Sequence, residues 1–208
     1  MRKLSRRKVI YAAGTAAGTA AAATLTASNI PVATAFRPQP QLAPPPFAHG
    51  VASGDPISNS VVLWTRISTQ DPQVTVRWQV STSRDFHSIT AHGTATTDSS
   101  RDYTIHVDPF SLQPATVYFY RFIVTTGHYA GQHSPIGRTK TAPTPGTPLD
   151  QVTLAVASCA NYESGYFSAY RDMADGAELF DATLFLGDYI YEYASGSYAG
   201  NGPVRLQD

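Results

Sequence analysis

The spacing of apolar residues divides the chain into two parts. Between Phe47 and Thr141, short stretches alternate apolar and polar residues and are separated by Gly, Pro, Ser and Asp. Alternation with period two predicts antiparallel strands that bury one face. The predicted strands cover residues 60–66, 74–80, 102–107 and 117–124. We therefore expect an antiparallel β-sandwich over residues 47–141.

The approach to the last of these strands indicates the kind of sandwich. Residues 112–120 (LQPATVYFY) resemble the approach to the F strand of fibronectin type III domains, where a tyrosine folds back on the preceding turn. Those domains contain no disulfide, and this stretch contains no cysteine. The predicted fold of the first domain is accordingly a fibronectin III or immunoglobulin-like β-sandwich.

The pattern changes after residue 150. Residues 152–157 (VTLAVA) and 182–186 (ATLFL) are apolar runs typical of strands that are covered on both faces. Between them, apolar residues recur at spacings of three and four, namely Tyr166, Phe167, Tyr170, Met173 and Ala174. This spacing predicts a helix from Glu163 to Asp175 that ends at Gly176. Strand, helix and strand together form the opening βαβ unit of an α/β domain.

Proline marks the boundaries between these parts. Residues 36–46 are predicted to form an extended lead-in, because FRPQPQLAPPP has too much proline for a helix or a sheet. A second proline-containing stretch predicts a linker at residues 142–150. The α/β segment then covers residues 151–208.

The first 35 residues have the pattern of an export signal. Five basic residues lie within the first eight, and an Ala/Gly/Thr stretch and an Ala-Thr-Ala ending follow them. Arg6 and Arg7, within Ser-Arg-Arg-Lys-Val-Ile, resemble the twin-arginine motif. We therefore expect residues 1–35 to be a signal peptide that uses the twin-arginine translocase. The mature protein would be periplasmic, bound to the cell envelope or extracellular.

Charge and hydropathy exclude two classes of partner. The whole chain has 15 basic and 15 acidic residues, and removal of residues 1–35 leaves 10 basic and 15 acidic ones, a net charge of −5. A negative mature chain argues against a nucleic-acid-binding surface. The mature part has no apolar stretch long enough to cross a bilayer, so we expect that it does not span a membrane.

Candidate metal ligands follow both apolar runs. Cys159 comes after the first run, and Asp188 and Tyr191 come after the second. The carboxyl ends of neighbouring strands meet at one edge of an α/β sheet, where thiol, carboxylate and phenol could bind a metal together. Because Cys159 is the single cysteine, it forms no internal disulfide. It remains a buried apolar residue, a reactive thiol or a metal ligand.

Four motifs in order resemble the PhoD-type alkaline phosphatase/phosphodiesterase family of the metallophosphoesterase superfamily. They are residues 47–56 (FAHGVASGDP), 61–66 (VVLWTR), 157–167 (ASCANYESGYF) and 186–192 (LGDYIYE). The resemblance implies an exported hydrolase of phosphate esters, with a β-sandwich in front of an α/β metallophosphoesterase domain. Its substrates would be phosphomonoesters and phosphodiesters, including phospholipid head groups in some relatives.

The resemblance also implies the cofactors and their ligands. By analogy with the family, Cys159, Asp188 and Tyr191 bind Fe(III), and Asp188 bridges to Ca(II). No catalytic residue beyond these metal ligands can be assigned. In the family, later strands supply the Asn, Asp and His residues that complete the site. We therefore expect the 208 residues to be the front part of an enzyme and to be inactive alone.

Two other functions are compatible with the residues. One is a non-catalytic secreted module, in which the sandwich binds a partner and the segment after it is degenerate. The other is a redox thiol at Cys159, which requires an electropositive pocket or a second cysteine. The sequence shows neither an electropositive pocket nor a second cysteine.

Overall fold

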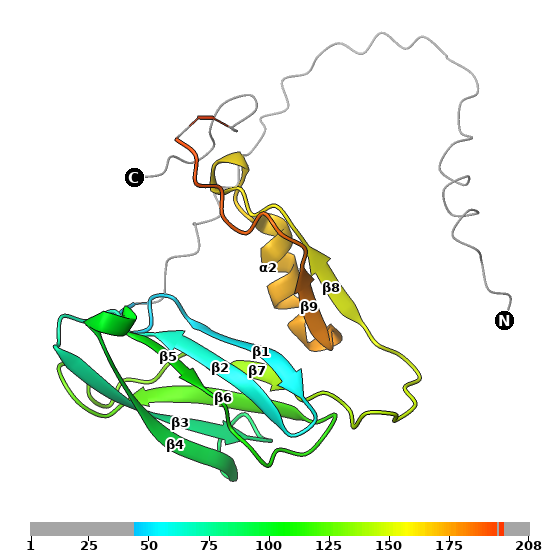
Figure 1. The fold of residues 1–208 in the computed structure, drawn as a ribbon, viewed down its shortest axis with the longest axis horizontal. Coiled ribbons are helices and arrows are strands. Elements are labelled where there is room, and N and C mark those ends of the chain that lie inside the picture. The colour runs from blue at the N-terminus through cyan, green and yellow to red at the C-terminus, as the bar shows by residue number, and fades with distance from the viewer. Residues whose placement is uncertain (1–43, 195, 198–208) are drawn as a thin grey trace, which may run out of the picture. The chain divides into compact units, whose positions relative to one another are not determined.

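A computed structural model of the chain describes residues 44–194 and 196–197 (Figure 1). These residues all belong to one compact unit, which comprises residues 38–208. The predicted signal peptide, with Arg6 and Arg7, and residues 36–43 of the lead-in lie outside the described residues.

Seven strands form two antiparallel sheets. The first sheet has the order β1-β2-β5 and the second has the order β4-β3-β6-β7. The strands of the first sheet are β1 (Val51–Ile57), β2 (Ser60–Arg66) and β5 (Thr104–Val107). Those of the second are β3 (Gln73–Ser81), β4 (Ile89–Asp98), β6 (Val117–Val124) and β7 (Gly137–Lys140), with the short helix η1 (Ser99–Arg101) after β4.

The core lies between these sheets. Alternate side chains of the central strands point inward and are almost fully buried, as period-two sequences require. They include Val61, Leu63, Val74, Val76, Val80, Tyr118, Tyr120, Phe122 and Val124. This arrangement confirms the predicted β-sandwich.

The sequence predicted the central strands more accurately than the edge strands. β2 and β6 have the predicted bounds, and β3 is one residue longer at each end. β5 begins at Thr104 rather than Asp102, because Asp102 and Tyr103 have left-handed backbone with φ of 50° and 54°. β1, β4 and β7 were not predicted, since they contain glycine or proline and have mixed polarity.

Two of these glycines face aromatic rings across the second sheet. Gly93 lies opposite Trp78, and Gly137 lies opposite Tyr120. A Cβ atom at Gly93 would lie 2.6 Å from the Trp78 ring, and one at Gly137 would lie 2.2 Å from the Tyr120 ring. Both positions therefore require the absence of a side chain.

The predicted fold-back of a tyrosine is confirmed at Tyr118. Its side chain is fully buried, and its hydroxyl accepts a hydrogen bond of 2.8 Å from the backbone N–H of Gln113. The tyrosine thereby fixes the turn that leads into β6.

The α/β segment contains a parallel strand pair with a helix between the strands. β8 (Leu154–Ala157) pairs with β9 (Ala182–Phe185), and α2 (Ser168–Asp175) lies between them in sequence. The short helices η2 (Tyr162–Ser164) and η3 (Ala177–Leu179) flank α2. The segment is therefore the predicted βαβ unit. None of the described helices is long and apolar enough to cross a membrane.

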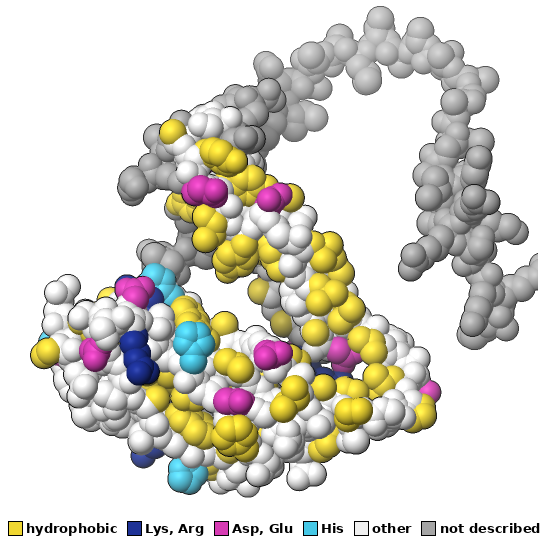
Figure 2. Space-filling view, viewed as in Figure 1, with side chains coloured by type: hydrophobic (Ala, Val, Ile, Leu, Met, Phe, Trp, Pro, Cys, Tyr) yellow, Lys and Arg dark blue, Asp and Glu magenta, His cyan; other side chains and the backbone are white. Residues whose placement is uncertain are grey.

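Two details of this segment differ from the prediction. The helix begins at Ser168 rather than Glu163, because Gly165 is extended and Phe167 has left-handed backbone with φ of 55°. It ends before Gly176, as predicted. The strands are not covered on both faces within the described residues, since Val156 is 56% exposed. Hydrophobic side chains accordingly appear on the surface of this segment (Figure 2).

The turn before β6 can be tested with Tyr118→Phe. This variant removes the hydroxyl and leaves the Gln113 N–H without its acceptor. We expect the free energy of unfolding to fall by about 1–2 kcal/mol, measured by urea denaturation. Tyr129→Phe is the control, because its hydroxyl makes no hydrogen bond within the described part of the chain. Equal stability of Tyr118→Phe and wild type would contradict this role.

Candidate metal centre

Backbone hydrogen bonds continue the parallel pairing beyond the ends of β8 and β9. The N–H of Leu186 donates to the Ala157 carbonyl at 2.8 Å, and the N–H of Cys159 donates to the Gly187 carbonyl at 3.1 Å. The N–H of Ala160 then donates to the Asp188 carbonyl at 2.8 Å. The loops after the two strands therefore lie side by side.

Both loops turn sharply at the predicted ligands. Cys159 and Asp188 have left-handed backbone, with φ of 62° and 53°, and Gly187 has φ of 117°. Left-handed backbone is uncommon for residues other than glycine, and such residues cluster at functional sites. The surrounding hydrogen bonds hold two of the three predicted ligands in this conformation.

The three predicted ligands come together at the carboxyl ends of the strands. The Cys159 Sγ lies 3.4 Å from Asp188 Oδ2. A hydrogen bond with the Cys159 side chain raises the pKa of the Tyr191 phenol, and desolvation and the charge of Asp188 act in the same direction. Tyr191 is therefore close enough to both side chains to interact with them.

The donors at this place fit a cation. Thiolate, carboxylate and phenolate are all anionic, and the raised pKa of Tyr191 shows that its neighbours disfavour a further negative charge. A bound cation would reverse this effect and favour all three anions. Among the described residues, no three His, Cys, Asp or Glu side chains are grouped to hold a metal, so Tyr191 is needed as the third donor.

Histidine contributes nothing near these loops in the described structure. All six histidines lie in the sandwich and are exposed. His49, for example, forms a hydrogen bond with Arg66 at 2.9 Å.

A buried carboxylate connects the two loops. Glu163 is 3% exposed, and the N–H of Gly196 lies 3.0 Å from both of its carboxylate oxygens. Asn161 Oδ1 accepts the N–H of Glu163 at 3.0 Å, which caps η2. Glu163 was predicted to begin a helix, and this contact was not predicted. The sequence signal for this turn is Asn161, two residues before Glu163, because an Asn side chain readily accepts a hydrogen bond from the backbone two residues further on.

Aromatic rings support the loop that carries Cys159. The Tyr170 hydroxyl of α2 donates to the Ser158 carbonyl at 2.9 Å. The centre of the Tyr170 ring lies 6.1 Å from the centre of the Phe185 ring and 5.3 Å from that of the Phe167 ring. The helix thereby contacts both β9 and the residue before Cys159.

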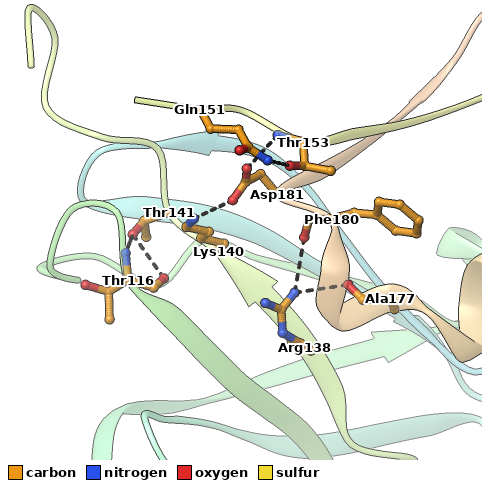
Figure 3. A network of polar contacts seen from close by, with 9 residues as sticks. All are labelled: Thr116, Arg138, Lys140, Thr141, Gln151, Thr153, Ala177, Phe180 and Asp181. Carbon is orange, nitrogen blue, oxygen red and sulfur yellow. Dashed lines mark hydrogen bonds and ion pairs between the residues drawn. The ribbon is translucent and has the colours of Figure 1, made fainter. Parts of the chain in front are cut away.

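A polar network connects the sandwich to the entry of the strand pair (Figure 3). Lys140 of β7 donates to Asp181 Oδ1 at 2.5 Å, and the N–H of Thr153 donates to Asp181 Oδ2 at 2.8 Å. Arg138 makes longer contacts with the carbonyls of Ala177 and Phe180, at 3.4 and 3.5 Å. Because β7 was not predicted from the sequence, this network was not predicted either.

Comparison with known proteins gives two matching family models. Residues 32–143 match the model described as PhoD-like phosphatase, N-terminal domain, and residues 154–207 match the model described as PhoD-like phosphatase. Alkaline phosphatase D of Bacillus subtilis (strain 168) is 42% identical over 213 residues, which cover 98% of this chain and 35% of that protein. The chain thus spans about a third of the length of this relative.

A solved structure also resembles the chain. The structure described as that of PhoD has a TM-score of 0.72 and 42% sequence identity, over 77% of this chain and 31% of that chain. This match supports both the sandwich and its continuation into a second fold. Fibronectin type III domains align at TM-scores near 0.3, too low for a conclusion about this chain.

The Lys140–Asp181 pair predicts a pH-dependent stability. Lys140 holds the pKa of Asp181 below its usual 3.8, and the N–H of Thr153 acts in the same direction. The pair therefore stabilises the folded state above the unfolded pKa, and this contribution is lost as the pH falls through the folded pKa. Lys140→Met should lower the unfolding midpoint in urea at pH 7 but have little effect at the lowest pH at which the protein stays folded.

The matched control for this experiment is Arg171→Met. It removes a positive charge from α2, where no ion pair with Arg171 occurs among the described residues. A Lys140→Met effect that is the same at both pH values, or no larger than that of the control, would refute the ion-pair contribution.

Proposed function

Because this chain belongs to the PhoD-like phosphatase family, we propose that it functions in metal-dependent hydrolysis of phosphate esters outside the cytoplasm. The observation that carries the proposal is the convergence of Cys159, Asp188 and Tyr191 at the ends of β8 and β9. These are three side chains that can become anionic ligands, and they lie on loops whose backbones are hydrogen-bonded to each other.

Each donor has a distinct proposed role. Cys159 and Tyr191 would hold Fe(III), since thiolate and phenolate donate enough charge to stabilise a trivalent ion. Asp188 would hold both this ion and Ca(II), since a carboxylate has two oxygens and calcium prefers oxygen ligands. The proximity of the Cys159 Sγ to Asp188 Oδ2, at 3.4 Å, supports a shared ion.

The chain's own contribution is to hold these donors in place before substrate binds. When bound, the cations would polarise the phosphoryl oxygens and stabilise negative charge in the transition state. The hydrogen bonds from Cys159 and Ala160 to the opposite loop limit movement of the ligands. The Tyr191 phenol holds its proton more tightly than an ordinary tyrosine. A cation that it binds would have to displace this proton to solvent.

The proposed substrates are phosphomonoesters and phosphodiesters, with phospholipid head groups as one class of diester. The name of the Bacillus relative, alkaline phosphatase D, supports phosphate-ester hydrolysis. The catalytic groups would be the metal ions and their ligands.

The proposed route to this location is the twin-arginine translocase. Arg6 and Arg7 precede an Ala-rich stretch of low hydrophobicity, which supports this route. The proposed division of the chain is a signal peptide at 1–35, a lead-in at 36–46, the sandwich at 47–141, a linker at 142–150 and the phosphoesterase segment from 151. The twin-arginine translocase carries folded proteins, so the site could receive its metal before export.

The metal site can be tested on the purified chain. We expect it to retain iron after gel filtration, measured by mass spectrometry, and to show a visible charge-transfer absorption from phenolate and thiolate. Tyr191→Phe should shift or abolish this absorption, and Cys159→Ala and Asp188→Asn should lose iron. Ser158→Ala is the control, since the Ser158 carbonyl accepts from Tyr170 and the Ser158 hydroxyl has no hydrogen bond among the described residues. Retention of iron by Cys159→Ala would refute the ligand assignment.

The activity can be tested in a chimera. This chain would replace the matching 35% of the Bacillus subtilis relative, and hydrolysis of bis(p-nitrophenyl) phosphate would be measured. We expect activity, and a loss of more than roughly 100-fold in Cys159→Ala and Asp188→Asn, because even outer-shell partners of a metal contribute about 10–100-fold. A folded chimera without activity would favour the non-catalytic binding module.

A further inference from the structure

Three basic side chains surround one position on the outer face of the four-stranded sheet. Arg77 of β3 lies opposite Ile123 of β6, and His133 forms an antiparallel bridge with Ile123 from the other side. Arg121 is two residues before Ile123 and therefore points to the same face. The pairing brings the three bases together from three neighbouring segments.

Arg121 is fixed in its position by uncharged partners. Its Nε donates to Gln79 Oε1 at 2.8 Å, and its guanidinium lies 4.2 Å from the centre of the Phe86 ring. This arrangement leaves the two terminal nitrogens of Arg121 for another acceptor. Within the described residues, neither Arg121 nor Arg77 forms an ion pair with a carboxylate.

A neighbouring arginine shows the contrast. Arg84 also lies near an aromatic ring, 5.6 Å from the centre of Phe119, but its guanidinium is 3.7 Å from Glu178. The charge of Arg84 is thus compensated by Glu178, whereas no described carboxylate pairs with Arg77 or Arg121.

The pKa of His133 is lowered from its usual value, and the same two arginines contribute to this shift. Desolvation lowers the pKa, and the positive charges of Arg121 and Arg77 lower it further. No carboxylate of the described residues raises the pKa of His133. The potential at this place is therefore positive, even though the mature chain is acidic overall.

We propose that Arg77, Arg121 and His133 form a binding site for a phosphate group on the outer face of the sandwich. Arginine presents several N–H donors in a planar fork that matches phosphate oxygens. Donors from three segments suit a tetrahedral oxyanion with several acceptor oxygens better than a planar carboxylate. The ligand is inorganic phosphate or the phosphate group of an ester.

The site is separate from the proposed metal centre. Its residues belong to β3, β6 and the segment that contains His133, whereas the metal centre belongs to the loops after β8 and β9. The site does not depend on the proposed function, so a failure of the metal assignment leaves it unaffected.

The test is a phosphate titration of the full chain at constant ionic strength, in which NMR monitors the chemical shifts of the backbone amides. One series uses inorganic phosphate, a second uses dimethyl phosphate as a diester, and a third uses chloride. We expect saturable shifts at residues 77, 121 and 133 with phosphate and none with chloride. Saturation by dimethyl phosphate as well would assign the site to phosphodiesters, and saturation by inorganic phosphate alone would assign it to the dianion.

Matched variants separate a specific site from general charge attraction. Arg121→Gln and Arg77→Gln should weaken binding about tenfold or more, because each removes charge-assisted hydrogen bonds. Arg84→Gln removes the same charge from the same face and should bind as wild type. Cys159→Ala should also bind as wild type, which excludes the metal centre as the source of the shifts.

Two results would overturn the proposal. One is the absence of saturable shifts at these residues with either phosphate ligand. The other is equal weakening by Arg84→Gln and Arg121→Gln. Unchanged amide shifts elsewhere in the spectra of the variants would show that each of them is folded.

Discussion

The parallel pairing of β8 with β9 is the interaction on which the candidate site depends. Each strand has only four residues, so the pairing needs support at both ends. At the entry, the Asp181 carboxylate accepts the N–H of Thr153, and the N–H of Asp181 donates to the Thr153 carbonyl. At the carboxyl ends of the strands, the N–H of Cys159 donates to the Gly187 carbonyl. A slip of one residue would break these contacts and separate the donors.

The contacts around this pair connect packing to chemistry. Lys140 neutralises Asp181 at the entry, and the buried Glu163 holds the loop around Gly196 at the exit. The segment has little buried apolar surface among the described residues, so hydrogen bonds and aromatic contacts account for much of its order. Such a region opens more easily than a core, which would suit the metal and substrate binding that we propose for these loops.

Sequence alone predicted the features that depend on local pattern. Alternating polarity was sufficient for β2 and β6, and the polar residues after two apolar runs were sufficient to place Cys159 and Asp188 at one sheet edge. The Lys140–Asp181 pair could not be predicted, because it depends on an edge strand that lacks a clear pattern. The start of α2 was predicted too early, because spacing does not reveal the left-handed backbone of Phe167.

The two glycines opposite aromatic rings have a consequence for the sandwich as a whole. β4 and β7 are the outer strands of the four-stranded sheet, and each contains a glycine that accepts a ring from its inner neighbour. A Cβ atom at Gly93 would clash with the Trp78 ring and one at Gly137 with the Tyr120 ring, so the observed alignment places a residue without a side chain opposite each ring. The two glycines thus favour the observed register of the outer strands β4 and β7 against their inner neighbours.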